Sequence, residues 1–208
     1  AFQKAGITSV TLPDSLRTIK DEAFRLSALT SVTLPEKFET VGTCAFCSAG
    51  KLASIDLGGT ISLGGSAFES TSAKEGVNFR PELNRLATIG DFAFSRTAQS
   101  SVTLPDSVTT VGEQAFSEST ALTSFHIGAG LSSFGETALY NDRKIATLTA
   151  SADNPVYSAE HNVLYRKADD GLHLMLSPAA NTLTDYAVRA GTVEIGASAF
   201  ANNKTLTR

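Results

Sequence analysis

The sequence has few charged residues and no cluster of positive charge. Only 18% of the residues are charged, Asp and Glu outnumber Lys and Arg by 21 to 17, and the net charge is −4. Proteins that bind nucleic acid or an anionic membrane surface need clustered Lys and Arg, which replace the counterions of phosphate groups. The composition therefore argues against both classes of partner.

Tryptophan and long apolar runs are also missing. The chain contains no apolar run of about 18 residues or more, which a membrane-spanning helix would need, and so we expect no membrane insertion. The first ten residues, AFQKAGITSV, lack the charged and apolar regions of a secretory signal peptide. Disorder is not expected either, because 42% of the residues are hydrophobic.

Cysteine and histidine are scarce, which leaves few residues for metal or redox chemistry. Cys44 and Cys47 form a CxxC pair, but no further cysteine exists to complete a four-cysteine zinc site. A redox pair normally opens a helix of a βαβ unit, whereas these two residues flank an Ala-Phe dipeptide. We interpret them as packing thiols or a local disulfide, and the sequence leaves their redox state open.

Catalytic motifs are missing as well. The spacing of His126, His161 and His173 fits no metal site, and no serine lies in a GxSxG turn. A calcium site would need several acidic ligands, but aspartates in turns account equally well for the three candidates, which are Asp153, Asp169 and Asp170. We therefore predict no enzyme, no cofactor and no metal.

The dominant positive feature is a repeat of 22 residues marked by the dipeptide Ala-Phe. Its Phe stands at positions 2, 24, 46, 68, 94, 116 and 200. Four extra residues enter between Phe68 and Phe94, and Leu139 takes the Phe place 23 residues after Phe116. A fixed period of this length predicts stacked coils, each of which buries its apolar face against its neighbours.

Each repeat has the pattern of one coil of a solenoid. An alternating segment such as 32–34 predicts a short, half-buried strand, and the following Pro35 ends it because proline cannot donate to a sheet. A second short apolar pair, Phe38 and Val41, predicts a second strand. The glycines at 42, 90, 112 and 196 then favour a tight bend before the Ala-Phe corner, where we expect a helical or 3-10 turn. The Phe residues should form an interior ladder.

The units LTSVTLPEKFETVGTCAF (29–46) and SVTLPDSVTTVGEQAF (101–116) resemble BspA-like leucine-rich repeats. The resemblance covers residues 1 to about 149 and resumes at Tyr186. Lys37 stands where the commonest leucine-rich pattern has Asn, so no buried Asn ladder is expected. The resemblance implies a bacterial surface or secreted protein of a kind associated with adhesion to hosts or other bacteria.

The period fails between residues 151 and 185. Here the sequence predicts a turn at Asn154-Pro155 and then a hairpin of 163–167 and 172–176. The form NPxYS followed by VLY also resembles insertions in BspA-like proteins. The segment has two interpretations, an enlarged coil that continues the stack or a protrusion that carries recognition. Alternating apolar residues favour the enlarged coil.

We predict a single leucine-rich-repeat solenoid over residues 1–208, mainly β, with one short parallel strand per coil. Regular repeats occupy 1–149, the irregular stretch occupies 151–185, and the repeat resumes over 186–208. Solenoids need capping repeats with a polar outer face, and neither end shows one. We therefore expect the natural protein to continue on both sides, where signal and anchor segments would lie, and we expect the fragment to be monomeric.

The candidate binding surface is the solvent side of the longer strands. Its central column, one residue per repeat, comprises Thr11, Thr33, Asp56, Asn78, Thr103, His126 and Thr149. A flanking column comprises Ser9, Ser31, Ser54, Gly76, Ser101, Ser124 and Thr147. Thr also suits any exposed strand, so the same pattern is compatible with plain solvated filling.

These observations favour an extracellular or cell-surface adhesion module whose partner is a protein or glycan on a host or bacterial surface. The alternative is a passive spacer within a larger surface protein. A glycan-binding or hydrolase-associated domain is less expected, because a hydrolase needs paired carboxylates at a cleft and the regular repeats supply none.

Overall fold

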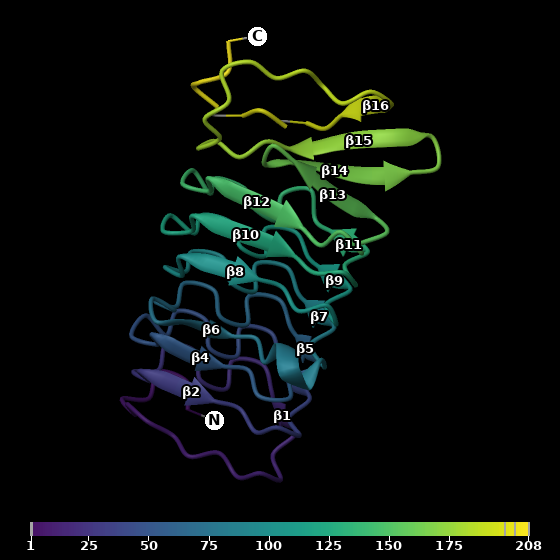
Figure 1. Ribbon diagram of the computed structural model, residues 1–208. Coiled ribbons are helices and arrows are strands. Elements are labelled where there is room, and N and C mark those ends of the chain that lie inside the picture. Colours follow the sequence, from purple (N-terminus) through teal and green to yellow (C-terminus); the bar gives the residue numbers. More distant parts are fainter. Residues whose placement is uncertain (1, 198, 202, 208) are drawn as a thin grey trace.

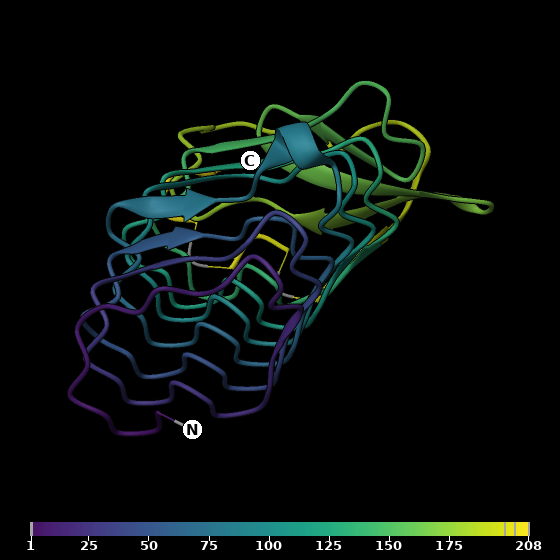
Figure 2. The ribbon, with the colours of Figure 1, turned by 90° about the horizontal axis from the view of Figure 1, so that it is seen from below.

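The chain winds into a stack of coils that runs from the N-terminus at one end to the C-terminus at the other (Figure 1). This computed structural model describes residues 2–197, 199–201 and 203–207. Seen along the stack, successive regular coils lie over one another in the same orientation (Figure 2). The predicted leucine-rich-repeat solenoid is confirmed, and its coils present three sides, namely two of short strands and one of Ala-Phe corners.

One side is a continuous parallel sheet of six two-residue strands. In each of them the second residue is buried. The strands, in the order in which they pair, are β1 (Thr18–Ile19), β3 (Thr40–Val41), β5 (Ser62–Leu63), β7 (Thr88–Ile89), β9 (Thr110–Val111) and β11 (Ser133–Phe134).

The second side, which we call the strand face, carries the longer strands. They form two separate parallel sheets of three, which are β2 (Ser31–Thr33), β4 (Ser54–Asp56) and β6 (Gly76–Asn78), then β8 (Ser101–Thr103), β10 (Ser124–Ile127) and β12 (Thr147–Ala150). The parallel pairing predicted for residues 1–149 is confirmed. The strand expected at 9–11 of the first coil is not formed.

The column of solvent-facing residues is divided between these two sheets. The four extra residues fall after β6, where the 3-10 helix η1 (Pro81–Leu83) begins. Arg80 and Asn84, on either side of η1, have the left-handed backbone conformation, with φ of 49° and 48°. β6 has the same three-residue length as β2 and β4, but the chain that follows it turns into η1, and β6 does not pair with β8.

The third side is built from the Ala-Phe corners, which are turns and not the helical turns that we expected. The residues two before and two after the Phe are left-handed, as at Cys44 (φ 55°) and Ser48 (φ 58°). The backbone N–H groups of Cys44, Phe46 and Ser48 consequently donate along the stack to carbonyls of the next coil, at 2.8 Å each. These bonds between coils alternate with bonds inside the corner between residues three apart, as from the Cys47 N–H to the Cys44 carbonyl (3.3 Å).

The predicted Phe ladder is confirmed. Consecutive rings from Phe2 to Phe116 stack with centroids 5.0–5.5 Å apart and planes within 14° of each other. Phe24 to Phe116 are at most 4% exposed, whereas Phe2 at the open end is 47% exposed. Leu139 continues the column and is 6% exposed.

The glycines before each corner are needed for close packing and not for the bend that we expected. None of Gly42, Gly90 and Gly112 has a positive φ. A Cβ at Gly90 would lie 2.8 Å from the carbonyl carbon of Gly64 in the preceding coil. At Gly42 and Gly112 it would lie 2.6 Å from the backbone nitrogens of Asp21 and Asp91, whereas at Gly196 the nearest atom is 3.1 Å away. The coils therefore approach each other at a line of residues without side chains.

Gly90→Ala should lower the free energy of unfolding by about 1–3 kcal/mol, because the new methyl group pushes two backbones apart in a packed stack. Gly50→Ala is the matched control, since its Cβ would meet nothing within 4 Å. We expect this control to change stability by less than about 1 kcal/mol. Urea denaturation of both variants measures the difference, and equal midpoints would contradict the packing role of Gly90.

The irregular stretch folds as an antiparallel layer within the stack. It consists of β13 (Tyr157–Glu160), β14 (Val163–Ala168) and β15 (Gly171–Leu176), and β16 (Thr192–Ile195) then pairs with β15 in parallel. Leu164 joins the main core, while Tyr165 and Leu174 join a second cluster with Ala199 of the last corner. The packed part of the predicted hairpin therefore continues the stack, while its far end projects beyond the coils (Figure 2).

Asn154 fixes the start of this layer. Its side-chain Nδ2 donates to the carbonyls of Gly128 (2.8 Å) and Leu131 (3.0 Å) in the preceding coil. Its Oδ1 accepts from the backbone N–H groups of Val156 (2.8 Å) and Tyr157 (2.6 Å). All of its bonding groups are satisfied at a site that is 1% exposed, so the predicted turn at Asn154-Pro155 is bound firmly to the regular coils.

Candidate functional site

The predicted column lies on the solvent side of the strand face. Five of its members are exposed, while Asp56 and His126 are half-buried. The pairing register aligns Thr33 with Asp56 and Asn78, and separately aligns Thr103 with His126 and Thr149. Thr11 lies on the first coil, outside any strand. The structure therefore brings the column together as two groups of three, with a gap between Asn78 and Thr103.

A cleft of about 410 Å³ occupies this gap. Its walls are the ends of β6 and β8 and the start of η1. The lining combines apolar and polar groups from Val77, Asn78, Phe79, Pro81, Ser101, Thr103, Leu104, Pro105, Asp106 and His126. We call it the strand-face cleft. It contains three members of the predicted column, and it exists because the extra residues prevent β6 from pairing with β8.

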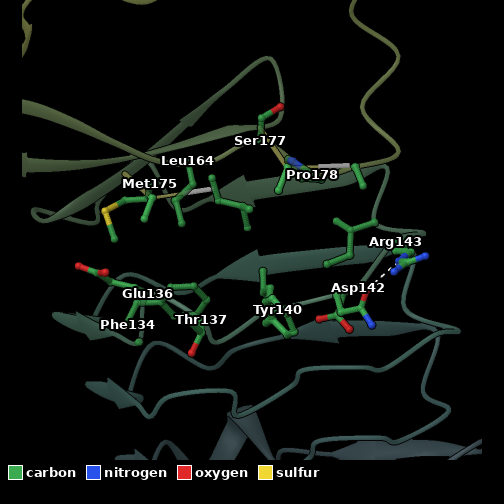
Figure 3. A pocket seen from close by; sticks show the side chains of 18 residues that line it. Phe134, Glu136, Thr137, Tyr140, Asp142, Arg143, Leu164, Met175, Ser177 and Pro178 are labelled. Atoms are coloured by element: carbon green, nitrogen blue, oxygen red, sulfur yellow. Dashed lines mark hydrogen bonds between the residues drawn. The ribbon is translucent and has the colours of Figure 1, made fainter. Parts of the chain in front are cut away.

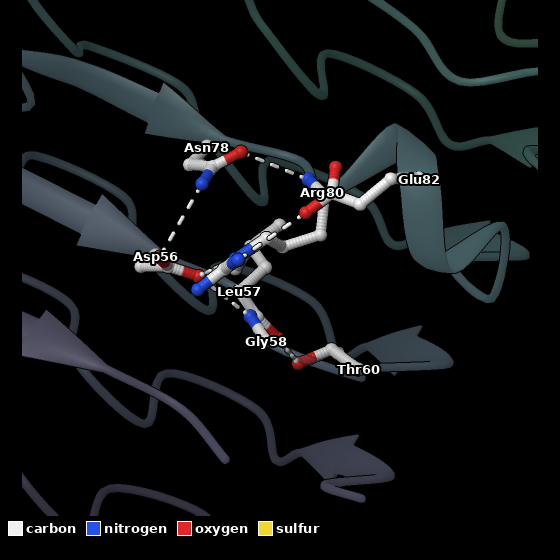
Figure 4. A network of polar contacts seen from close by, with 7 residues as sticks. All are labelled: Asp56, Leu57, Gly58, Thr60, Asn78, Arg80 and Glu82. Atoms are coloured by element: carbon white, nitrogen blue, oxygen red, sulfur yellow. Dashed lines mark hydrogen bonds and ion pairs between the residues drawn. The ribbon is translucent and has the colours of Figure 1, made fainter. Parts of the chain in front are cut away.

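A network of polar contacts centred on Asp56 lies at one edge of the cleft (Figure 4). The Arg80 Nε donates to Asp56 Oδ1 at 2.7 Å, and its Nη1 contacts Glu82 at 3.2 Å. The Asp56 carboxylate also accepts from the Asn78 side chain (3.3 Å) and from the Gly58 backbone N–H (2.9 Å). The hydrogen bond that Arg80 donates to Asp56, and then the one that it donates to Glu82, raise the pKa of Arg80 above its ordinary value.

Arg80 and Glu82 were missed by the sequence reasoning, since they lie outside the repeat. Arg80 is 24 residues beyond its partner Asp56, in the four-residue addition to the coil. The column departs from Thr at three positions, and two of these, Asp56 and Asn78, directly precede the added residues, which was the available signal. Both carboxylates contact the guanidinium and hold it in one orientation, so its positive charge is paired within the network.

The opposite edge of the cleft has fewer charges. The His126 Nδ1 lies 2.9 Å from the hydroxyl of Thr149, its neighbour in the column. Asp106 accepts a hydrogen bond of 2.7 Å from the backbone N–H of Ala129. These contacts orient the side chains that the cleft presents between the two sheets.

The remaining candidates lie elsewhere. Cys44 and Cys47 form a disulfide across their corner, with Cα atoms 4.7 Å apart, on a different side from the strand face. His161 and His173 belong to the irregular layer, where His173 lies 2.9 Å from Asp170 and 2.8 Å from Glu194. Across the part of the chain that the structure describes, no three His, Cys, Asp or Glu residues are grouped so as to hold a metal ion.

No helix among the described residues has the length and apolarity needed to cross a membrane. The exclusion of catalysis stays a prediction, because it follows from motifs that the sequence lacks. The arrangement on the strand face provides hydrogen-bonding groups, an Arg side chain paired with two carboxylates, and apolar side chains in the cleft.

Residues 1–88 and 87–166 match the model of the BspA type leucine rich repeat region, in six copies. No curated protein sequence matches the chain. Among solved structures, a leucine-rich repeat protein from Eubacterium ventriosum is 22% identical with a TM-score of 0.76, covering 86% of this chain and 47% of its own. A leucine rich cell surface protein from Faecalibacterium prausnitzii is 24% identical with a TM-score of 0.64, covering 91% and 57%.

The pneumococcal vaccine antigen PcpA is 18% identical with a TM-score of 0.62, covering 97% of this chain and 57% of its own. At these identities the likeness concerns the fold. The chain spans 47–57% of the length of these three solved proteins.

Proposed function

Because the chain belongs to the BspA-type leucine-rich repeat family, we propose that it is an extracellular or cell-surface adhesion module that binds a protein through its strand face. The observation that carries this proposal is the strand-face cleft beside the Asp56–Arg80 network. A regular solenoid side has no such opening, and here the extra residues create one at the centre of the predicted binding column.

The chemistry of the cleft suits a protein partner. Its apolar floor, which includes Phe79 and Leu104, can accept an apolar side chain, while Asn78 and Thr103 offer hydrogen bonds at the rim. Arg is enriched in protein interfaces, and an Arg already held by two carboxylates loses little entropy on binding. The surrounding Ser and Thr side chains are short, so ordering them also costs little.

A surface location is supported by the cell-surface description of the F. prausnitzii protein with the same fold. The disulfide between Cys44 and Cys47 is consistent with an oxidising compartment, where such bonds persist. A passive spacer is the competing function, and it requires no partner for the cleft.

The double substitution Asn78→Arg and Thr103→Arg should reduce binding at least ten-fold, since it places two bulky cations at the mouth of the cleft. The chain is immobilised and tested by surface plasmon resonance against host matrix proteins, mucins and suspended bacteria. Thr18→Arg with Ser133→Arg is the matched control, because both residues are exposed on the continuous sheet and the charge change is equal. This control should bind within two-fold of the parent chain.

Equal binding by the two double variants would show that the cleft is not the contact surface. If the parent chain bound none of these partners, the spacer function would be favoured. Thermal melts of both variants, compared with the parent chain, separate a loss of binding from a loss of folding.

A further inference from the structure

A second cavity, of about 360 Å³, lies where the regular coils meet the irregular layer. One wall is the last regular corner, from Gly135 to Arg143, and the other is formed by Leu164 and by the end of β15 with Ser177 and Pro178 (Figure 3). The irregular layer has no Ala-Phe corner of its own, so the stack of corners is interrupted here. We call this cavity the ladder-end pocket.

The interruption leaves two backbone donors without acceptors. In the regular coils every second corner N–H bonds to the next coil, as from Phe94 to Ala115 (2.7 Å) and from Phe116 to Ala138 (2.9 Å). The equivalent N–H groups of Leu139 and Asn141 find no acceptor among the described residues. Both residues line the pocket. Unpaired backbone donors beside an apolar cavity are costly, and a partner that supplies carbonyl groups relieves this cost.

Asp142 adds a third unsatisfied group to the same wall. It occupies the position that Thr97 and Ser119 hold in earlier coils, where their hydroxyls bond to each other at 3.2 Å. The Asp142 Oδ1 accepts from the Ser119 backbone N–H at 2.7 Å, whereas Oδ2 has no partner and the residue is 5% exposed. A buried carboxyl oxygen without a partner marks an incomplete site.

We propose that the ladder-end pocket binds a peptide segment of a partner protein, which adopts the turn conformation of the missing corner and carries one bulky apolar side chain. Two of its carbonyls accept hydrogen bonds from the Leu139 and Asn141 N–H groups. Its apolar side chain packs on Leu139 and continues the Phe ladder, against Met175 and Pro178 on the opposite wall. This pocket is distinct from the strand-face cleft and does not depend on it.

The spacing of the free donors favours a peptide over a lipid or another small molecule. Leu139 and Asn141 are two residues apart, and in a regular corner the equivalent N–H groups of Phe46 and Ser48 bond to the carbonyls of Ala67 and Glu69, which are also two residues apart. Phe fills this place of the ladder in the regular coils, so a phenyl ring is the side chain that we expect the pocket to accept. The volume also lies within the range of roughly 300–1,000 Å³ that is common for ligand sites.

The protein's own corner provides the probe, an acetylated and amidated octapeptide GEQAFSES with the sequence of residues 112–119. It is titrated into the isotope-labelled chain and followed by backbone amide NMR. We expect saturable downfield shifts of the Leu139 and Asn141 amide protons, which form the new hydrogen bonds. The amides of Thr33 and Thr103 on the strand face should not move.

Two controls make the test specific. The peptide GEQAASES, which lacks the phenyl ring, should bind at least ten-fold more weakly. In the protein, Ala179→Trp fills the pocket wall and should abolish the shifts, while Ala121→Trp outside the pocket should preserve them. Amide spectra of both variants report whether each remains folded.

The proposal is overturned if the octapeptide shifts neither amide at concentrations of about 1 mM, a weak but measurable affinity. It is equally overturned if GEQAASES binds as well as GEQAFSES, or if Ala179→Trp and Ala121→Trp respond alike. The variant with Asn78→Arg and Thr103→Arg should still bind the octapeptide, so that failure at one site is distinguishable from failure at the other.

Discussion

Phe94→Ala should lower the free energy of unfolding by about 3–5 kcal/mol, through lost transfer energy and the cavity that it leaves. Phe94 is 0% exposed. Its ring stacks between Phe68 (5.4 Å) and Phe116 (5.5 Å) and also meets the edge of Phe79 (5.7 Å). The neighbouring rings are held by their own coils and cannot close the gap, so little of the cavity collapses.

Thr103→Ala is the control for this substitution, because Thr103 is exposed on the strand face. It should cost less than about 1 kcal/mol. Denaturant melts of the two variants give the comparison, and equal losses would show that the buried and exposed faces are wrongly assigned. A solenoid couples nearest neighbours, so Phe94→Ala should also separate unfolding into two steps, visible as a broadened transition.

The period of the sequence was sufficient to predict the stack, its parallel strands and the buried Phe column. These features follow from spacing alone, since a 22-residue interval places each Phe above the last. The corner conformation could not be predicted in the same way. Residues such as Cys44 and Ser48 are not glycine, and their left-handed conformation is stabilised by hydrogen bonds to the next coil, which no local pattern records.

The candidate site was predicted only in part for a related reason. The alternation along each strand identified Asn78, Thr103 and His126 as solvent-facing, and the structure places all three at the cleft. The cleft itself results from residues that depart from the period. Arg80 contacts Asp56 because η1 redirects the chain. Inserted residues such as Arg80 have no equivalent in the other repeats, so an alignment of the repeats does not predict where they lie.

The stability of the protein should fall as the pH rises from about 4 to 8, because of Asp142. Burial is the main cause that raises the pKa of this carboxyl from 3.8 to about 8, and the nearby charge of Glu118 raises it further. The hydrogen bond from the Ser119 N–H opposes the shift but is a smaller effect. Within this pH window the folded protein keeps a proton that the unfolded chain has lost. Each further step in pH therefore favours unfolding.

The loss should amount to roughly 3–6 kcal/mol across the window and level off above about pH 8, because each unit of pKa difference corresponds to about 1.4 kcal/mol. Asp142→Asn keeps an oxygen that accepts from the Ser119 N–H, but its side chain cannot ionise. The urea midpoint of this variant should therefore change with pH much less than that of the parent chain.

Asp91→Asn is the matched control, since Asp91 accepts a similar bond from the Glu113 N–H (2.9 Å) but is exposed. It should retain the parent's pH dependence. If the urea midpoints of Asp142→Asn and of the parent chain changed in parallel from pH 5 to 9, Asp142 would be ionised in the folded state. The polar group that lines the ladder-end pocket would then be a carboxylate and not a protonated acid.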